Sequence, residues 1–310
     1  MARVAAIGEC MIELRHVGGA ALELAFGGDT LNTAVYLKRA APASDVAYAT
    51  ALGDDPYSAQ MREFFAAEGL ALDLVATLPG RLPGLYAIRT DAAGERTFFY
   101  WRAEAAARAM LDGAPGEALA AALARREWIY FSGVTLSILA PPARARLLAA
   151  LAAARAAGAR IAFDPNFRPR GWPDRDEARA AMTAGFRAAD IALPSFGDEQ
   201  ALHGDESPEG TVVRIAALGP SEIAVKDGPA PVRLRAGGGA RAIAVPAVAK
   251  VVDTTAAGDA FNAGYLASRI AGRDPERAVA AGTRLAQAVI GARGAVIPRS
   301  AMPADPLGAA

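Results

Sequence analysis

Apolar and polar positions follow two different rhythms along this chain of 310 residues. From about residue 110 onward, short β-rich apolar runs alternate with longer Ala/Leu/Arg segments at helical spacing, which is typical of βαβ units. The predicted strands are 128–131, 159–163, 191–193 and 223–226, and the predicted helices lie near 115–126, 141–157, 174–188 and 198–203. The pattern predicts one α/β domain, spanning residues 1–310, with a doubly wound and mainly parallel sheet.

Two stretches break this rhythm, residues 10–26 and residues 83–102. In the second, two β-rich runs flank the segment 91–95, which predicts a β-hairpin. If the two stretches pair, they form a small β-sheet separate from the main one, and such an insertion is suited to cover a cleft. We therefore predict a lid built from these two segments. Gly237-Gly238-Gly239 is expected to be a surface turn with no role in phosphate binding.

Composition narrows the classes of function. The 33 basic and 33 acidic side chains give no formal net charge, and scattered arginines argue against binding to nucleic acid or to an anionic membrane. Cys10 is the only cysteine, and His16 and His203 are the only histidines, so any metal should have oxygen ligands. Arg interrupts each Ala/Leu-rich stretch before the ~20 apolar residues of a membrane span. The short apolar N-terminus predicts a buried strand and no signal peptide, so we expect a cytoplasmic protein.

The segment 253–264 carries the most chemical information. The turn Ala256-Ala257-Gly258-Asp259 precedes an apolar helical pattern that runs through about residue 270. If residues 256–258 begin a helix, their unpaired N–H groups and the positive end of the helix dipole can stabilise a transferring phosphoryl group. Asp259 can then accept the proton of an attacking hydroxyl. An ordinary helix start, in which an acid complements the dipole, explains the four-residue turn equally well.

The longer pattern resembles the C-terminal signature of the ribokinase-like (PfkB) carbohydrate kinases, in Asp253, the two threonines, the small trio, Asp259 and the pair Ala263-Gly264. The Walker-type loop Gly-x-x-x-x-Gly-Lys-Ser/Thr is absent from the sequence. The resemblance implies a three-layer α/β/α core with a small β-sheet lid, ATP and Mg²⁺, room for a monovalent cation, and a homo-oligomer.

The segment 27–34 resembles the N-terminal sugar-binding signature of the same family. It places a Gly turn before a helix, and the resemblance implies that Gly28, Asp29 and Asn32 bind the substrate. Gly28 permits a close backbone approach, and the Asn32 amide can donate to and accept from vicinal hydroxyls. Thr30 departs from the Gly, Ala or Pro that many members have there. A helix that simply begins at a glycine is the structural alternative.

One branch of the family is more closely similar. The segments 8–14, 27–33, 83–86 and 100–102 look like those of the bacterial 2-keto-3-deoxygluconate kinases, and the likeness covers nearly the whole chain. It implies that Tyr86, Tyr100 and Arg102 close over the substrate. An arginine offers the carboxylate of a sugar acid a bidentate, charge-assisted pair that a neutral sugar does not need. A solvated arginine beside a hydrophobic strand face is the alternative.

Polar residues follow the strand near 160–163. The side chains of Asp164, Asn166 and Arg168 should emerge at the carboxyl end of the sheet, where open α/β folds bind ligands. The resemblance implies that Arg168 contacts the substrate or the transferred phosphate, and that Asn166 contacts the phosphates or their Mg²⁺. A turn stabilised by Asp164 and Asn166 is an equally open alternative.

Three further positions complete the implied nucleotide site. The family usually has Asn-x-x-Glu after the next strand, where it organises the metal through water; here Ser195 replaces Asn, and Asp198 or Glu199 can serve. We take Glu199 as the indirect metal candidate, while an acid pair at a helix start is the alternative. The resemblance also implies that Lys226, Gly228 and Gly291 belong to the adenine and ribose pocket.

These residues together predict an ATP-dependent kinase that phosphorylates 2-keto-3-deoxy-D-gluconate at a primary hydroxyl. Asp259 is the expected general base, and the helix start 256–258 is the expected anion site. The alternatives are a fructokinase- or ribokinase-like enzyme for a neutral sugar and, less favoured, a nucleoside kinase. A non-catalytic regulator that binds a nucleotide or a sugar is a third class, which has little reason to keep Asp259 beside the anion turn. Only small-molecule partners are expected besides copies of the chain.

Overall fold

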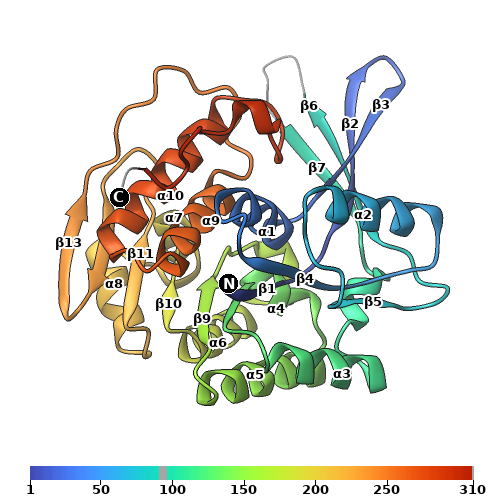
Figure 1. Ribbon diagram of the computed structural model, residues 1–310, viewed down its shortest axis with the longest axis horizontal. Helices are drawn as coiled ribbons and strands as arrows, with labels where there is room; N and C mark the ends of the chain where they lie inside the picture. The colour runs from blue at the N-terminus through green and yellow to red at the C-terminus, as the bar shows by residue number, and fades with distance from the viewer. Residues whose placement is uncertain (91–95, 309–310) are drawn as a thin grey trace.

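The computed structural model describes residues 1–90 and 96–308. Its main sheet has nine strands in the order β13-β12-β11-β10-β9-β8-β1-β4-β5 (Figure 1). Seven strands run parallel, while β12 and β13 are antiparallel at one edge. The bounds are β1 Arg3–Ile7, β4 Asp45–Leu52, β5 Val75–Thr77, β8 Trp128–Ser132, β9 Arg160–Asp164, β10 Ile191–Ala192, β11 Glu222–Val225, β12 Val232–Ala236 and β13 Gly239–Ile243.

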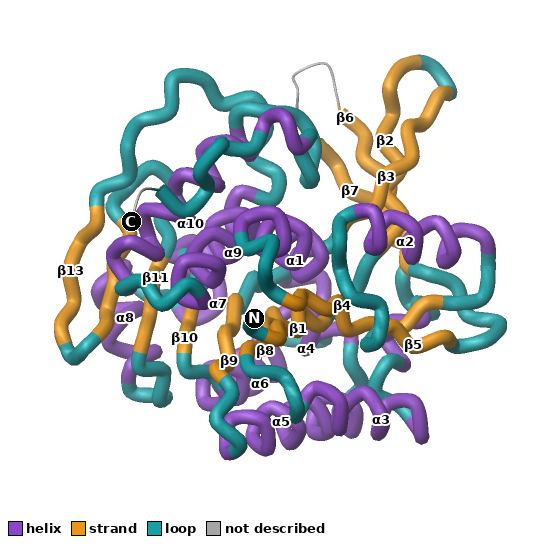
Figure 2. The backbone as a smooth tube through the Cα atoms, in the orientation of Figure 1, coloured by secondary structure: helices purple, strands orange, loops and turns teal. Residues whose placement is uncertain are grey.

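Both faces of the main sheet are covered by helices, as Figure 2 shows. One layer holds α1 Asp29–Ala40, α2 Pro56–Ala67, α9 Ala257–Ile270 and α10 Pro275–Ile290. The other holds α3 Gly113–Leu123, α4 Gly133–Ile138, α5 Pro141–Ala156, α6 Arg175–Ala188, α7 Phe196–His203 and α8 Pro208–Ala216. The strands alternate between the two apolar cores, so that in β1 Val4 and Ala6 join one core while Ala5 and Ile7 join the other. The predicted three-layer α/β/α core is confirmed.

A small sheet stands beside this core, with strand order β3-β2-β6-β7. Its strands are β2 Met11–Gly18, β3 Ala21–Gly27, β6 Gly84–Thr90 and β7 Arg96–Trp101. The two inserted stretches do pair, because β2 runs parallel to β6 with Met11 opposite Gly84. β6 and β7 pair antiparallel, as the hairpin prediction requires, while the predicted turn 91–95 lies outside the described residues. That the small sheet closes over a cleft stays a prediction.

The predicted elements agree closely with the observed ones, but no element was predicted within residues 45–77, where the structure has β4, α2 and β5. The sequence did not predict the antiparallel pair β12 and β13, whose connection is the Gly237–Gly238 turn. It also did not predict the short helices α4 and α8. The predicted helix after Asp259 is confirmed as α9, which ends at Ile270.

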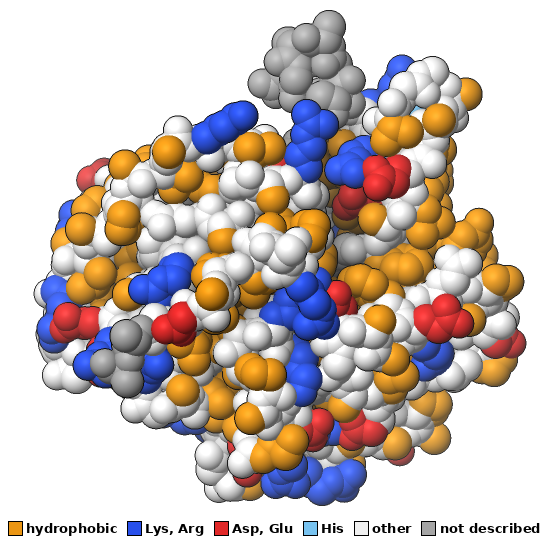
Figure 3. Space-filling model, turned by 45° about the horizontal axis from the view of Figure 1, so that its top comes forward, with side chains coloured by type: hydrophobic (Ala, Val, Ile, Leu, Met, Phe, Trp, Pro, Cys, Tyr) orange, Lys and Arg blue, Asp and Glu red, His pale blue; other side chains and the backbone are white. Residues whose placement is uncertain are grey.

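Surface properties fit the balanced composition. On the face that Figure 3 shows, basic and acidic side chains are interspersed. Within residues 1–90 and 96–308, no helix combines the length and the apolar character needed to cross a membrane.

Candidate active site

The start of α9 lies at the centre of the candidate site. The helix begins at Ala257, and its N-cap, Ala256, has φ 60°, a left-handed conformation that costs a non-glycine residue about 1–2 kcal/mol. No side chain caps this end, and the N–H groups of Gly258 and Asp259 donate to no acceptor among the described residues. The Ala257 N–H makes only a 3.3 Å bond to the Thr254 carbonyl. The strained turn therefore leaves donors free at the positive end of a helix, as anion binding requires.

The carboxylate of Asp259 lies in the first turn of α9 and receives a 2.9 Å hydrogen bond from Asn32 Nδ2. The pKa of Asp259 is raised to about 8, mainly because its carboxyl is buried and also because the charge of Asp29 lies close by. The bond from Asn32 and the charge of Lys226 oppose this rise. A carboxylate whose pKa lies near neutrality can take up a proton at physiological pH, as a general base must.

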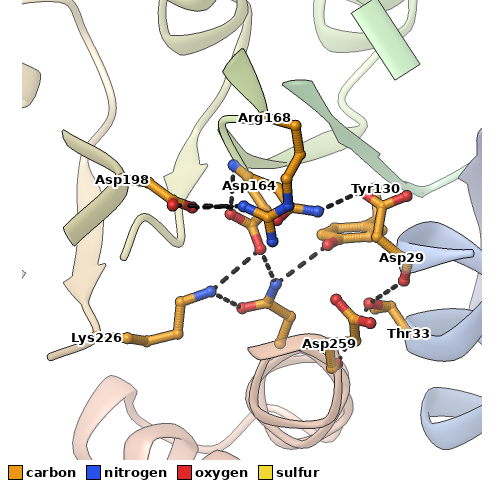
Figure 4. A network of polar contacts seen from close by, with 10 residues as sticks. Asp29, Thr33, Tyr130, Asp164, Arg168, Asp198, Lys226 and Asp259 are labelled. Carbon is orange, nitrogen blue, oxygen red and sulfur yellow. Dashed lines mark hydrogen bonds and ion pairs between the residues drawn. The ribbon is translucent and has the colours of Figure 1, made fainter. Parts of the chain in front are cut away.

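A buried network joins the carboxyl ends of the strands to α9 (Figure 4). Lys226 Nζ, just after β11, donates to Asp164 Oδ2 at 3.1 Å and to Asn262 Oδ1 at 2.9 Å. Asn262 Nδ2 in turn donates to Asp164 Oδ2 at 2.6 Å and to the Tyr130 hydroxyl at 3.1 Å. A Cβ added to Gly258 would lie 3.7 Å from Lys226 Nζ, so the ammonium group is next to the anion turn. Lys226, which was predicted for the adenine pocket, thus lies beside the turn that is predicted to bind the phosphoryl group.

The start of α1 brings the predicted sugar-binding segment to the same place. Gly28 is required there because a Cβ would collide with the carbonyl oxygen of Glu9. Asp29 Oδ2 accepts a 2.8 Å bond from Asn166 Nδ2, and the Asn166 N–H donates to Asp164 Oδ1 at 3.0 Å. Asn166 has φ 37°, which its bond to the Asp164 carboxylate stabilises. The predicted turn at Asp164 and Asn166 is therefore present and links the two predicted segments, while the ligand-binding role of Asn166 stays a prediction.

Arg168 lies at the edge of this network. Its side chain is 59% exposed, donates to the Phe167 carbonyl at 2.8 Å and contacts the Asp198 carboxylate at 3.4 Å (Figure 4). Burial raises the pKa of Asp198, while the guanidinium of Arg168 lowers it. A long, exposed ion pair is worth little, so Arg168 can turn toward an incoming anion at small cost.

Two of the residues predicted for the small-sheet cluster, Arg102 and Tyr86, are tied to buried acids. Arg102 forms an ion pair with Glu9, and the Tyr86 hydroxyl donates to Glu13. Tyr100 is 47% exposed, with its ring 5.8 Å from the ring of Tyr86. The guanidinium of Arg102 lies 5.9 Å from the centre of the Tyr100 ring. The predicted aromatic and basic cluster thus exists, but the Arg102 guanidinium and the Tyr86 hydroxyl already have partners.

A cavity of about 1280 Å³ lies between β7 and the loop after β9. We call it the arginine-lined cavity, because its lining includes Arg102, Arg108, Arg144, Arg168 and Arg170. Three of the predicted substrate residues, Tyr100, Arg102 and Arg168, therefore share one cavity, while Asp259 and Asn32 lie outside its lining. Arg168 belongs both to this cavity and to the network around Asp164 and Asp198.

The remaining predicted nucleotide residues lie around the end of β11. Ser195, the N-cap of α7, forms a parallel bridge with Lys226. Gly228, two residues farther on, has φ 53°. Gly291 ends α10, and the preceding Ile290 carbonyl accepts the N–H groups of residues 252 and 253, just before the anion turn. The adenine and ribose roles of Gly228 and Gly291 stay predictions.

Glu199, the indirect metal candidate, is fully buried and receives a 2.6 Å bond from Arg214. Burial raises the pKa of Glu199 to about 7, and its Oε1 has no hydrogen-bond partner. Among the described residues, no group of three His, Cys, Asp or Glu side chains could hold a metal ion. Mg²⁺ keeps several waters and binds substrate phosphates, so it needs no such protein cage. The unpartnered Glu199 oxygen fits a contact through water.

Sequence reasoning gave no role to three polar residues that the structure places at the site: Glu9, Glu13 and Asn262. All three are buried, with exposures of 2%, 6% and 0%. The available signal was a polar residue inside an apolar run, since buried polar groups require partners. Their partners are distant in sequence, as with Glu9 and Arg102, which are 93 residues apart.

The profile of the pfkB family carbohydrate kinases matches residues 1–302. The chain belongs to this family. A 2-dehydro-3-deoxygluconokinase of Dickeya dadantii is 46% identical over 307 residues, which cover 97% of this chain and 98% of that protein. A protein of the same name from Escherichia coli K12 is 45% identical over 308 residues, covering 97% and 99%. The relatives thus span the whole fold, including the small sheet.

Solved structures agree with this family. A PfkB protein from Polaromonas sp. JS666 has a TM-score of 0.82 and 26% identity, covering 94% of this chain and 97% of its own. An Escherichia coli protein described as a putative ribokinase II, solved with ATP and Mg²⁺, has a TM-score of 0.83 and 22% identity, covering 95% and 94%. The ribokinase-like fold predicted from the sequence is confirmed.

Proposed function

We propose that this chain transfers the γ-phosphoryl group of ATP to the primary hydroxyl of 2-dehydro-3-deoxy-D-gluconate, the compound also called 2-keto-3-deoxy-D-gluconate. The observation that carries the chemistry is Asp259, a base with a pKa of about 8 beside two free N–H donors at the start of α9. The names of the relatives that match nearly the whole chain support the substrate.

In this proposal Asp259 takes the proton of the sugar hydroxyl as its oxygen attacks the γ-phosphorus of ATP. The bond between that phosphorus and the β–γ bridging oxygen breaks, and ADP leaves with the electron pair. The N–H groups of Gly258 and Asp259 hold the charge that develops on the phosphoryl oxygens. The ammonium of Lys226 supplies a positive charge beside the same turn. Positioning and electrostatics therefore account for the catalysis.

The nucleotide and the metal are part of the proposal. Ser195, Asn166, Lys226, Gly228 and Gly291 are the residues proposed to hold ATP. Glu199, through its unpartnered Oε1 and a water, would hold Mg²⁺. When bound, the ion neutralises charge on the phosphate oxygens. The solved relative that contains both ATP and Mg²⁺ supports this assignment. A monovalent cation, the homo-oligomer and the cellular location stay predictions of the sequence.

A neutral sugar is the second candidate substrate, because a Klebsiella pneumoniae fructokinase is 30% identical over 285 residues. The two candidates differ in the need for a carboxylate site. Among the described residues, the lining of the arginine-lined cavity has one acid and five arginines, which favours the acid substrate.

The decisive experiment measures ADP release from ATP and Mg²⁺ with a panel of sugar acids and neutral sugars. We expect a kcat/KM for 2-dehydro-3-deoxy-D-gluconate far above that for fructose or ribose, with the phosphate placed on the primary hydroxyl, as phosphorus NMR of the product can establish. Good turnover of fructose, with none of any 2-dehydro-3-deoxy acid, would overturn the substrate assignment and leave the kinase chemistry intact.

A further inference from the structure

Arg102, which follows β7, contributes little net positive charge to the arginine-lined cavity. Arg102 is paired with Glu9, whose residue surface is only 2% exposed. Burial raises the pKa of Glu9, but the guanidinium groups of Arg102 and Arg108 both lower it. With Glu9 ionised, the pair it forms with Arg102 has no net charge. A substrate carboxylate that approached Arg102 alone would therefore also meet the negative charge of Glu9.

The other arginines of the arginine-lined cavity differ in what already holds them. Arg144 forms a 3.0 Å ion pair with Glu177, which is the only acid among the described residues of the lining, and it also donates to the carbonyls of Leu136 and Leu139. Arg168 contacts Asp198. The charges of Arg144 and Glu177 cancel within the cavity, and the charge of Arg168 is partly offset.

Arg108 differs from Arg102, Arg144 and Arg168 because it has no such partner among the described residues. Arg170 also has none among them, but it is exposed, whereas Arg108 is half-buried. Arg108 lies in the short 3-10 helix Ala106–Ala109 and lines the cavity together with Tyr100 and Arg102. Within residues 1–90 and 96–308, its guanidinium has no hydrogen bond and no ion pair of its own. Its charge nevertheless acts on Glu9. Glu9, Arg102 and Arg108 together therefore carry one net positive charge, which is the complement of one carboxylate.

We propose that Arg108 is the specificity-determining residue that supplies the net charge for the carboxylate of the sugar acid, while Arg102, fixed by Glu9, orients it. This inference rests on the proposed function and deepens it. Both guanidinium groups, one held by Glu9 and one free, can donate to the same carboxylate. The uncharged hydroxyls of a neutral sugar would gain little from Arg108.

The test compares Arg108→Gln with the wild type on the sugar acid and on its uncharged amide. Loss of a charge-assisted contact worth about 1.5–3 kcal/mol raises KM for the acid about 10- to 100-fold. We expect kcat within about threefold and KM for the amide within about twofold of the wild type, since the amide does not use the charge. Arg108→Lys, which keeps the charge but not the planar fork, should fall between the two.

Arg170→Gln is the matched control, because Arg170 lines the same cavity but is exposed on another 3-10 helix. Its KM for the acid should change less than about twofold. Arg108→Met provides a second neutral variant, and an unchanged melting temperature establishes that each variant is folded. A KM for the acid that stays within twofold in a folded neutral variant would overturn the inference, as would equal rises for acid and amide.

The two proposals fail in different ways. If the wild type phosphorylates the acid and Arg108→Gln does so equally well, only the role of Arg108 is wrong. If the wild type phosphorylates neutral sugars alone, the substrate assignment and the role of Arg108 are both wrong.

Discussion

At the start of α9, burial and the nearby Asp29 leave Asp259 with a charge that its surroundings do not fully balance, and its pKa rises to about 8. In the small sheet, by contrast, Arg102 has Glu9 and the Tyr86 hydroxyl has Glu13 as partners. In the first region, the carboxylate of Asp259 has too few polar partners to balance its charge. In the second region, Arg102 and Tyr86 are held in fixed positions by buried acids. In the proposed function, this difference separates the residues that act in the reaction from those that select the substrate.

The largest effect should come from removing the carboxylate of Asp259. Asp259→Asn keeps an acceptor for Asn32 Nδ2 but cannot take a proton, so kcat for ADP release should fall about 10²- to 10⁴-fold. Asp274→Asn is the control, because Asp274 is an acid at the start of α10 that caps its helix, and asparagine caps equally well. A kcat within tenfold of the wild type in Asp259→Asn would remove the general base from the mechanism.

Asp259→Asn should also change how the folding stability depends on pH. The folded-state pKa of Asp259, about 8, lies above the ~3.9 of an unfolded aspartate, so the folded state holds the proton more tightly. The stability from this group is fully present below pH ~4 and is lost as the pH rises through about 8. Asp259→Asn should therefore melt higher than the wild type at pH 9.

Removing the buried ion pair between Lys226 and Asp164 should destabilise the fold. Lys226→Met leaves Asp164, which is 4% exposed, without its cation, and such a loss costs about 3–5 kcal/mol. The measurement is the free energy of unfolding in urea. The double variant Lys226→Met/Asp164→Asn should recover much of that loss, because no buried charge is then left unpaired. Additive losses in the two single variants would contradict an ion pair that matters to stability.

The pH dependence of the wild type should report the unbalanced group directly. Because the carboxylate of Asp259 is the active form, kcat/KM should rise with pH up to about 8 and level off above it. Two pH units below, at pH 6, it should be reduced about 100-fold. Steady-state rates between pH 6 and 9.5 test this, and the residual rate of Asp259→Asn should lack the rise. A flat wild-type profile would mean that bound substrates lower this pKa or that another base acts.

The smallest effect should come from the small sheet. Tyr86→Phe removes the donor to Glu13, which is 6% exposed, and leaves a buried acceptor unsatisfied at a cost of about 1–3 kcal/mol of unfolding free energy. We expect kcat to change less than threefold. Tyr57→Phe, a 46% exposed tyrosine, should change stability by less than about 0.5 kcal/mol. A large loss of kcat in Tyr86→Phe would undo the separation of the two regions.

The sequence predicted the parallel core because its strands are short apolar runs between long helical segments, and the small sheet because its two segments break that rhythm. It did not predict β12, where Arg233 and Arg235 alternate with buried apolar residues, because the predicted strands were found as continuous apolar runs. Helix α4 has only six residues, too few to show a helical period.

Within the site, the sequence predicted the residues but not their partners. Asp259, Asn32 and Gly28 follow from local turns, whereas the ion pairs of Arg102 with Glu9 and of Glu199 with Arg214 depend on how distant segments pack. Thr30, which departs from the family pattern, is accommodated because Gly8 leaves room for its side chain and the Tyr48 hydroxyl bonds it at 3.2 Å. These contacts of Thr30 join separate segments of the chain, so the sequence alone does not reveal them.

The short link between β1 and β2, residues 8–10, gives the molecule a mechanical property. Its Glu9 carbonyl lies against Gly28 at the start of α1, while the Glu9 side chain is bonded to Arg102 at the end of β7. One residue thus contacts both α1 and the small sheet where the chain leaves the main sheet. If the small sheet rotates about this point, Arg102 stays close to α1 while the far ends of β2 and β3 move the most.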